Sequence, residues 1–207
     1  MSTPPRISYP GAYYHIISRG NNKSTLFVDD ADRLKYLKLL QLCSKDFDLK
    51  IYAYVLMTNH THIFLETLKA NISKVMHRIN LDYTNYFNKK YGRTGHLFES
   101  RFKGKLVQKE RYFLAVLRYI HLNPVKAGLV NKPEAYKWSS HKGYVMGGDK
   151  IIANMGDVLN YFSKNEKKAR TEYKEFINLP VSAKEWSILD KQRNGILGDS
   201  SFRKSKR

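Results

Sequence analysis

The chain has 207 residues, 42% of them hydrophobic, which suits one well-buried domain with an extension or two small domains. It has 37 lysine and arginine residues against 18 aspartate and glutamate residues. The part up to Val130 holds 21 basic and 9 acidic residues and the part after it holds 16 and 9, so both parts are basic. Such a surface favours binding to nucleic acid over a charge excess kept only for solubility. A single cysteine excludes an intrachain disulfide. The N-terminus has no apolar signal core, and no apolar stretch approaches about 18 residues, so we expect a cytoplasmic protein with no membrane partner.

The hydrophobic pattern predicts, in chain order, a strand, a helix, two strands, a helix, a strand and a helix. The expected ranges are Ala12–Ser18, Asp29–Asp46, Ile51–Met57, His60–Leu65, Asn71–Gly92, Arg101–Val107 and Glu110–Asn123. Pro124 disfavours helical geometry at the preceding residue and therefore predicts the end of the last helix. This order indicates an α+β fold of the ferredoxin-like or RRM-like type, an antiparallel sheet with helices on one face.

We assign this ferredoxin-like domain to residues 1–130. The pattern weakens afterwards, and residues 131–207 are expected to form a basic, partly helical C-terminal extension. Helical spacing recurs at Met155–Phe162 and Ala169–Ile177, whereas Gly195–Arg207 is expected to be loose.

Two histidines follow a predicted turn at Asn59. Side chains alternate between the faces of a strand, so His60 and His62 point the same way and can share a metal ion. Such a pair alone is more often an accident of packing. Tyr119 and Asn123 lie one helical turn apart and can supply a nucleophile and a carbonyl ligand, provided that their helix covers the histidine face of the sheet.

A cluster of cations and aromatic rings precedes and enters the fourth predicted strand. Cations track phosphates and rings stack on unpaired bases, although core aromatics beneath a solvated loop would look the same. The candidate DNA-binding residues are Lys89, Lys90, Arg93, Arg101, Lys103 and Lys105. Interleaved with them are Tyr91, His96, Phe98 and Phe102. Arg19 and Lys23, beside the first strand, form a second candidate contact.

Four blocks of this sequence resemble the REP-associated tyrosine transposases, relatives of the single-tyrosine HUH transposases. They occur in the expected order and spacing within Arg6–Trp138, and they are Tyr9–Gly20, Tyr54–His62, Gly95–Lys103 and Arg118–Val130. Two positions depart from the family pattern: Thr61 stands where the residue between the histidines is usually apolar, and Thr58 where proline is common. Thr61 should point away from the metal.

The resemblance implies that Tyr119 is the catalytic nucleophile and that His60, His62 and Asn123 are the metal ligands. It implies a transposase, a single-strand DNA endonuclease and strand-transferase that cuts hairpin-forming, REP-like DNA through a 5′-phosphotyrosine intermediate. It also implies Mg²⁺ or Mn²⁺ as the cofactor, although two imidazoles and an amide would suit zinc or manganese by softness. The expected location is the nucleoid in the cytoplasm, and both a monomer and a dimer remain open.

Two other readings compete with this one. The first is a non-catalytic, single-stranded nucleic-acid-binding module on the same fold, in which the histidines and Tyr119 have no reason to converge. The second is another HUH nuclease of the replication-initiator or relaxase type. For His15, His77 and His121 we favour packed or surface roles over catalytic ones.

Overall fold

The computed structural model describes residues 6–152, 155–190 and 195–206. Five strands form one sheet in the order β2-β3-β1-β4-β5. The strands are β1 (Ala12–Arg19), β2 (Leu49–Leu56), β3 (His60–Thr67), β4 (Lys103–Val107) and β5 (Ile196–Leu197). The α-helices are α1 (Asp30–Asp46), α2 (Ile72–Tyr91), α3 (Lys109–Lys126), α4 (His141–Met146), α5 (Met155–Leu159), α6 (Glu166–Asn178), α7 (Ala183–Asp190) and α8 (Ser200–Ser205). Two short 3₁₀ helices span Asn21–Lys23 and Pro133–Ala135.

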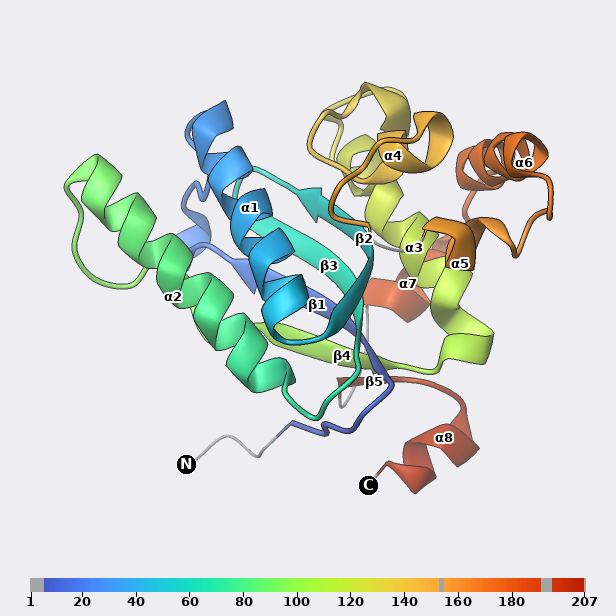
Figure 1. Cartoon of the computed structure of the whole chain (residues 1–207), viewed down its shortest axis with the longest axis horizontal. Helices are drawn as coiled ribbons and strands as arrows, with labels where there is room; N and C mark the ends of the chain where they lie inside the picture. The colour runs from blue at the N-terminus through green and yellow to red at the C-terminus, as the bar shows by residue number, and fades with distance from the viewer. Residues whose placement is uncertain (1–5, 153–154, 191–194, 207) are drawn as a thin grey trace.

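Helices cover both faces of this sheet (Figure 1). Strand β1 lies in the middle, antiparallel to β3 and β4. Thr61 is fully buried, with its hydroxyl 3.4 Å from that of Tyr36 in α1, so this face carries α1 and the neighbouring α2. The next residue along β3, His62, faces the opposite way, where its ring contacts Tyr119 of α3. The predicted α+β fold is confirmed. The expectation of helices on one face is wrong, because α3 covers the second face, and the expectation of a purely antiparallel sheet is wrong, because β5 pairs in parallel with β4.

Helix boundaries follow local chemistry. The Asp29 side chain accepts a hydrogen bond from the Asp32 backbone N–H at 2.9 Å and, with the reciprocal bond, forms a capping box at the start of α1. Helix α2 ends at Gly92, whose φ of 58° lies in the left-handed region. Helix α3 continues to Lys126, past Pro124, so the end predicted at Asn123 is wrong. Proline removes one hydrogen bond, but the surrounding core keeps Pro124 buried and the helix intact.

The C-terminal extension packs on the α3 side of the sheet. Helix α6 contacts both α3 and α4, and β5 pairs in parallel with β4 through Leu106 and Ile196. The expectation of a loose segment from Gly195 is therefore wrong up to residue 206, and Arg207 lies outside the described residues. The division at residue 130 stays a prediction. Within the described residues, no helix combines the length and apolar character needed to cross a membrane.

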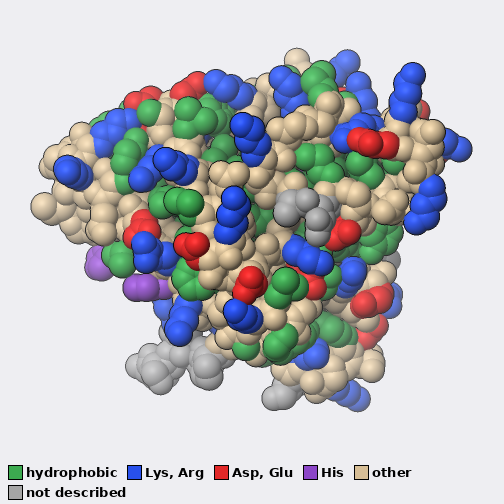
Figure 2. All heavy atoms as spheres, in the orientation of Figure 1, with side chains coloured by type: hydrophobic (Ala, Val, Ile, Leu, Met, Phe, Trp, Pro, Cys, Tyr) green, Lys and Arg blue, Asp and Glu red, His purple; other side chains and the backbone are tan. Residues whose placement is uncertain are grey.

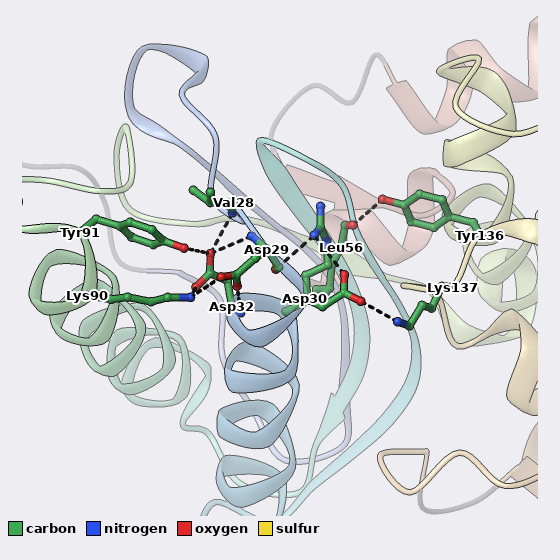
Figure 3. Close-up of polar contacts among 10 residues, drawn as sticks. Val28, Asp29, Asp30, Asp32, Leu56, Lys90, Tyr91, Tyr136 and Lys137 are labelled. Carbon is green, nitrogen blue, oxygen red and sulfur yellow. Dashed lines mark hydrogen bonds and ion pairs between the residues drawn. The ribbon is translucent and has the colours of Figure 1, made fainter.

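A buried carboxylate joins the start of α1 to the end of α2. Asp32 is fully buried and accepts hydrogen bonds from the Val28 backbone and from the Tyr91 hydroxyl, both at 2.8 Å, while Lys90 pairs with it at 2.8 Å (Figure 3). The Tyr86 hydroxyl donates a further bond at 3.0 Å. Burial alone would raise the pKa of Asp32, but these partners outweigh it and hold the pKa below its usual value.

A second buried polar cluster ties the extension to α3. His121 is fully buried, with Nε2 at 2.8 Å from the Ser140 hydroxyl and Nδ1 at 2.5 Å from the Tyr173 hydroxyl. Burial and neighbouring His141 lower its pKa well below the usual value. The geometry matches the packed role that we favoured for His121.

Candidate active site

One cavity gathers the residues that the sequence singled out. His60 and His62 from β3 and Tyr119 and Asn123 from α3 all line a cavity of about 560 Å³. Helix α3 therefore covers the face of the sheet that carries His60 and His62, as the sequence analysis required for the two pairs to act together. A larger cavity, of about 860 Å³, lies on the other side of residues 99–101. Its lining includes none of the four residues, so we place the candidate chemistry in the smaller cavity.

The rings in this cavity are in close contact. The His60 and His62 ring centroids are 5.0 Å apart, and those of His62 and Tyr119 are 5.8 Å apart. The Asn123 side-chain N–H donates to the Tyr119 backbone carbonyl at 2.8 Å. This bond holds the amide in one orientation and leaves its oxygen on the opposite side, as a ligand oxygen requires. Tyr119 is only 7% exposed and Asn123 only 8%, so their positions are fixed by packing.

Hydrogen bonds select the ring nitrogens that face the cavity. The Asn59 amide N–H donates to the Lys23 carbonyl at 3.2 Å, which turns the amide oxygen toward His60 Nδ1 at 2.7 Å. Because that oxygen only accepts, Nδ1 of His60 bears the proton and Nε2 keeps its lone pair. His62 Nδ1 lies 2.9 Å from His15 Nε2. Nε2 is therefore the nitrogen of His60 suited to bind a metal ion, whereas in His62 the choice depends on which of the two facing nitrogens bears the proton.

Electrostatics keep both imidazoles neutral. Burial, and after it the positive charge of Arg19, lowers the pKa of His60 to about 4. Burial, the neighbouring rings of His15 and His60 and the charge of Lys105 lower the pKa of His62 well below its usual value. Metal ligation requires the neutral imidazole, so at pH 7 the pair needs no proton release to bind a cation.

Half of the predicted DNA-binding cations line the same cavity. Its rim carries Arg19, Arg101, Lys103 and Lys105. Lys105 also donates to the Leu189 carbonyl at 2.6 Å. Figure 2 shows lysine and arginine spread over the visible face of the molecule, rather than gathered in one patch. The distribution of charge on that face therefore does not single out a site.

The other four predicted cations lie elsewhere. Lys90 pairs with Asp29 at 2.7 Å and with Asp32, and these contacts raise its pKa. The Arg93 guanidinium lies 5.6 Å from the centre of the Phe87 ring. Lys23 and Lys89 are exposed and do not line the cavity. Lys90 thus has a structural role, which the basic pattern alone did not show.

The interleaved aromatic rings are mainly structural. Phe102 is 5% exposed and stacks under the Arg6 guanidinium at 3.8 Å, and Tyr91 donates to Asp32. Phe98 packs against the core. Only His96 in this group is exposed, so the three rings belong to the core, although three of the cations interleaved with them line the cavity.

Three neighbours of Tyr119 and His62 were not predicted. His15 contacts the His62 ring, Lys126 lines the cavity, and Trp186 of α7 lies 5.3 Å from the Tyr119 ring. Lys126 could have been found, because it lies seven residues from Tyr119 and therefore on the same helical face. No local pattern connects Trp186 to Tyr119, since the contact spans 67 residues of sequence.

The C-terminal extension is anchored beside Tyr119. Arg118, next to Tyr119, donates to the carbonyls of Leu179 and of Pro180, the latter at 2.9 Å, and pairs with Glu185 at 3.5 Å. The Lys126 ammonium lies 4.3 Å from the centre of the Trp186 ring. These contacts hold α7 against the rim of the cavity.

Comparison with known proteins places this arrangement in a family. A structure of a REP-associated tyrosine transposase bound to a REP hairpin is similar, with a TM-score of 0.60 and 19% identity over 73% of this chain and 90% of that one. No curated protein matches the chain significantly. The family model described as "Transposase IS200 like" matches residues 8–123, more than half of the sequence and all four candidate residues. The chain therefore belongs to the IS200-like transposase family.

Proposed function

We propose that the protein is a single-strand DNA endonuclease and strand-transferase that acts on hairpin-forming DNA through a 5′-phosphotyrosine intermediate. The observation that carries this proposal is the placement of Tyr119 against the His60 and His62 pair in one cation-lined cavity. Family membership supports it, and so does the hairpin bound by the similar transposase.

Tyr119 would perform the chemical step. Its hydroxyl oxygen attacks the phosphorus of a phosphodiester, the bond from phosphorus to the 3′ oxygen breaks, and a bond from phosphorus to the tyrosine oxygen forms. The phenol proton is lost and the departing 3′ oxygen gains a proton, so the products are a 5′-phosphotyrosine and a free 3′-hydroxyl. The phosphotyrosine bond preserves the energy of the original ester, which allows a second 3′-hydroxyl to rejoin the strand.

The residues present fit a divalent cation. Among the described residues, no three His, Cys, Asp or Glu side chains are grouped to hold a metal ion. The donor set would instead be Nε2 of His60, Nε2 of His62 and the Asn123 amide oxygen, each on a side chain whose other polar atom takes part in a hydrogen bond. A bound cation would withdraw charge from the phosphate. We propose Mg²⁺ or Mn²⁺, and the imidazoles favour Mn²⁺ of the two.

A non-catalytic binding module is the main alternative. It accounts for the basic rim but not for the neutral histidine pair beside a buried tyrosine. A replication initiator or relaxase would share the histidines. The placement of Asn123 one turn beyond Tyr119, with both in the histidine cavity, favours the transposase among these enzymes.

The experiment that tests the function is a covalent-trapping assay. We expect the purified protein, mixed with Mn²⁺ and a labelled single-stranded hairpin oligonucleotide, to give a band of lower mobility on a denaturing gel. EDTA should abolish the band, and renewed Mn²⁺ should restore it. DNA binding without any covalent band, over a panel of hairpins that the protein demonstrably binds, would support the binding module instead.

The cavity cations should contribute to DNA affinity more than the distant ones. We expect the double substitution of Arg101 and Lys103 by alanine to weaken hairpin binding and to reduce the slope of log affinity against log salt by about 1–2. The matched control replaces Lys89 and Arg93, which removes the same charge outside the cavity. Equal losses in the two double variants, measured by fluorescence anisotropy, would show that only net charge matters.

A further inference from the structure

A third histidine lies against the proposed metal pair. His15, in the centre of β1, is 1% exposed. Its ring is stacked on His62 with centroids 5.1 Å apart and planes at 22°, and it meets the Tyr119 ring edge-on at 5.5 Å. One side chain therefore contacts both a proposed ligand and the proposed nucleophile.

The strand register brings these rings together. Ile17 pairs with His62 across β1 and β3, and His15 pairs with Phe64, so His15 and His62 are diagonal neighbours on the same face of the sheet. His62 is itself only 4% exposed. Because little solvent reaches either ring, a water molecule is a poor substitute for the contact between them.

The contact determines which His62 nitrogen bears the proton. Nε2 of His15 and Nδ1 of His62 are 2.9 Å apart, so in the neutral pair one donates and the other accepts. When His15 Nε2 accepts, His62 Nδ1 bears the proton and His62 Nε2 keeps its lone pair for the cavity. When the roles reverse, the lone pair of His62 faces His15 and is lost to a ligand.

We propose that His15 is a positioning residue that accepts the Nδ1–H of His62, fixes its tautomer and ring orientation for metal binding, and holds that ring against Tyr119. This inference rests on the proposed function, since it takes His62 as a metal ligand. It gives β1 a further residue at the site, in addition to Arg19, which lines the cavity.

Calorimetric titration of the purified protein with Mn²⁺ tests the inference without requiring turnover. His15→Leu fills similar space without an acceptor, and we expect Mn²⁺ to bind about 10–100-fold more weakly, as is typical when a partner of a ligating histidine is lost. His15→Gln can place an amide oxygen near the position of Nε2 and should restore binding to within about threefold of the unmodified protein. A control, His121→Gln, changes a buried histidine outside the cavity and should leave Mn²⁺ affinity unchanged.

Two comparisons separate the possible failures. If His62→Ala binds Mn²⁺ as tightly as the unmodified protein, the proposed metal site itself is wrong. If His62→Ala loses Mn²⁺ binding but His15→Leu does not, only the positioning role is wrong. Thermal melting identifies folded variants. If His15→Leu does not fold, His15→Asn takes its place. The asparagine side chain is polar but too short to reach His62. This variant should bind Mn²⁺ as weakly as expected for His15→Leu. Unchanged affinity in His15→Asn would overturn the inference.

Discussion

Replacing Tyr119 by phenylalanine should lower formation of the covalent protein–DNA product by at least about 10³-fold while hairpin binding stays within about twofold. The substitution removes only the hydroxyl oxygen, the atom that would attack phosphorus. The ring remains, and with it the contacts to His15, His62 and Trp186 that hold α3 against the sheet. Denaturing gels measure the covalent product, and fluorescence anisotropy measures binding to the same labelled hairpin.

Tyr112 supplies the matched control. It lies on the same helix, outside the cavity, beside Arg111. Tyr112→Phe should form the covalent product at the rate of the unmodified protein. A covalent band of normal intensity in Tyr119→Phe would mean that another residue is the nucleophile, and peptide mapping of the labelled adduct would then identify it.

Replacing Asp32 by alanine should reduce the free energy of unfolding by about 3–5 kcal/mol. The carboxylate is fully buried and joins Lys90, Tyr86, Tyr91 and the Val28 backbone, so its loss leaves several donors without an acceptor. For a chain of this size, such a loss corresponds to a fall in the melting temperature of roughly 6–20 °C. Denaturant unfolding followed by circular dichroism measures the change.

Asp46, exposed at the other end of α1, is the control for Asp32. Removing its charge near the C-terminus of the helix should change stability by less than about 0.5 kcal/mol.

The pH dependence of the effect of Asp32→Ala gives a second check. Because the folded-state pKa of Asp32 is lowered, its stabilising contribution is complete above an unfolded-state pKa of about 4 and is lost as pH falls through the lower folded-state value. The difference in the free energy of unfolding between the unmodified protein and Asp32→Ala should therefore shrink in acid. A difference that stays constant as the pH falls would contradict this account.

Much of the fold was predictable because its signals are local. The capping aspartates before α1, the left-handed glycine after α2 and the strand alternation around His60 and His62 each act within a few residues. The end of α3 was not predictable, because tertiary packing keeps Pro124 within the helix. Strand β5 has only two residues, too few to show any periodicity, and its pairing with β4 depends on contacts formed late in the chain.

The site divides in a similar way. Strand and helix periods place His60 beside His62 and Tyr119 beside Asn123. Neither local pattern predicts that the two pairs meet, which only the family resemblance and the fold indicate. The structural role of Lys90 was missed, because a run of cations does not reveal the buried Asp32 that pairs with one of them. The contacts of His15 and Trp186 with the candidate residues depend on which elements pack together, so residue type alone favoured an unremarkable role for His15.

The late position of β5 has a consequence for protein synthesis. Every residue that lines the cavity of His60, His62, Tyr119 and Asn123 has been translated by Ala127, yet the outer edge of β4 is covered only when Ile196 and Leu197 arrive. At about 5–20 residues per second, that edge stays open for roughly 4–14 s after Ala127 is added. An open strand edge invites pairing with other chains. Polypeptides terminated between these two points should carry a complete set of cavity residues but aggregate more readily than the full-length chain.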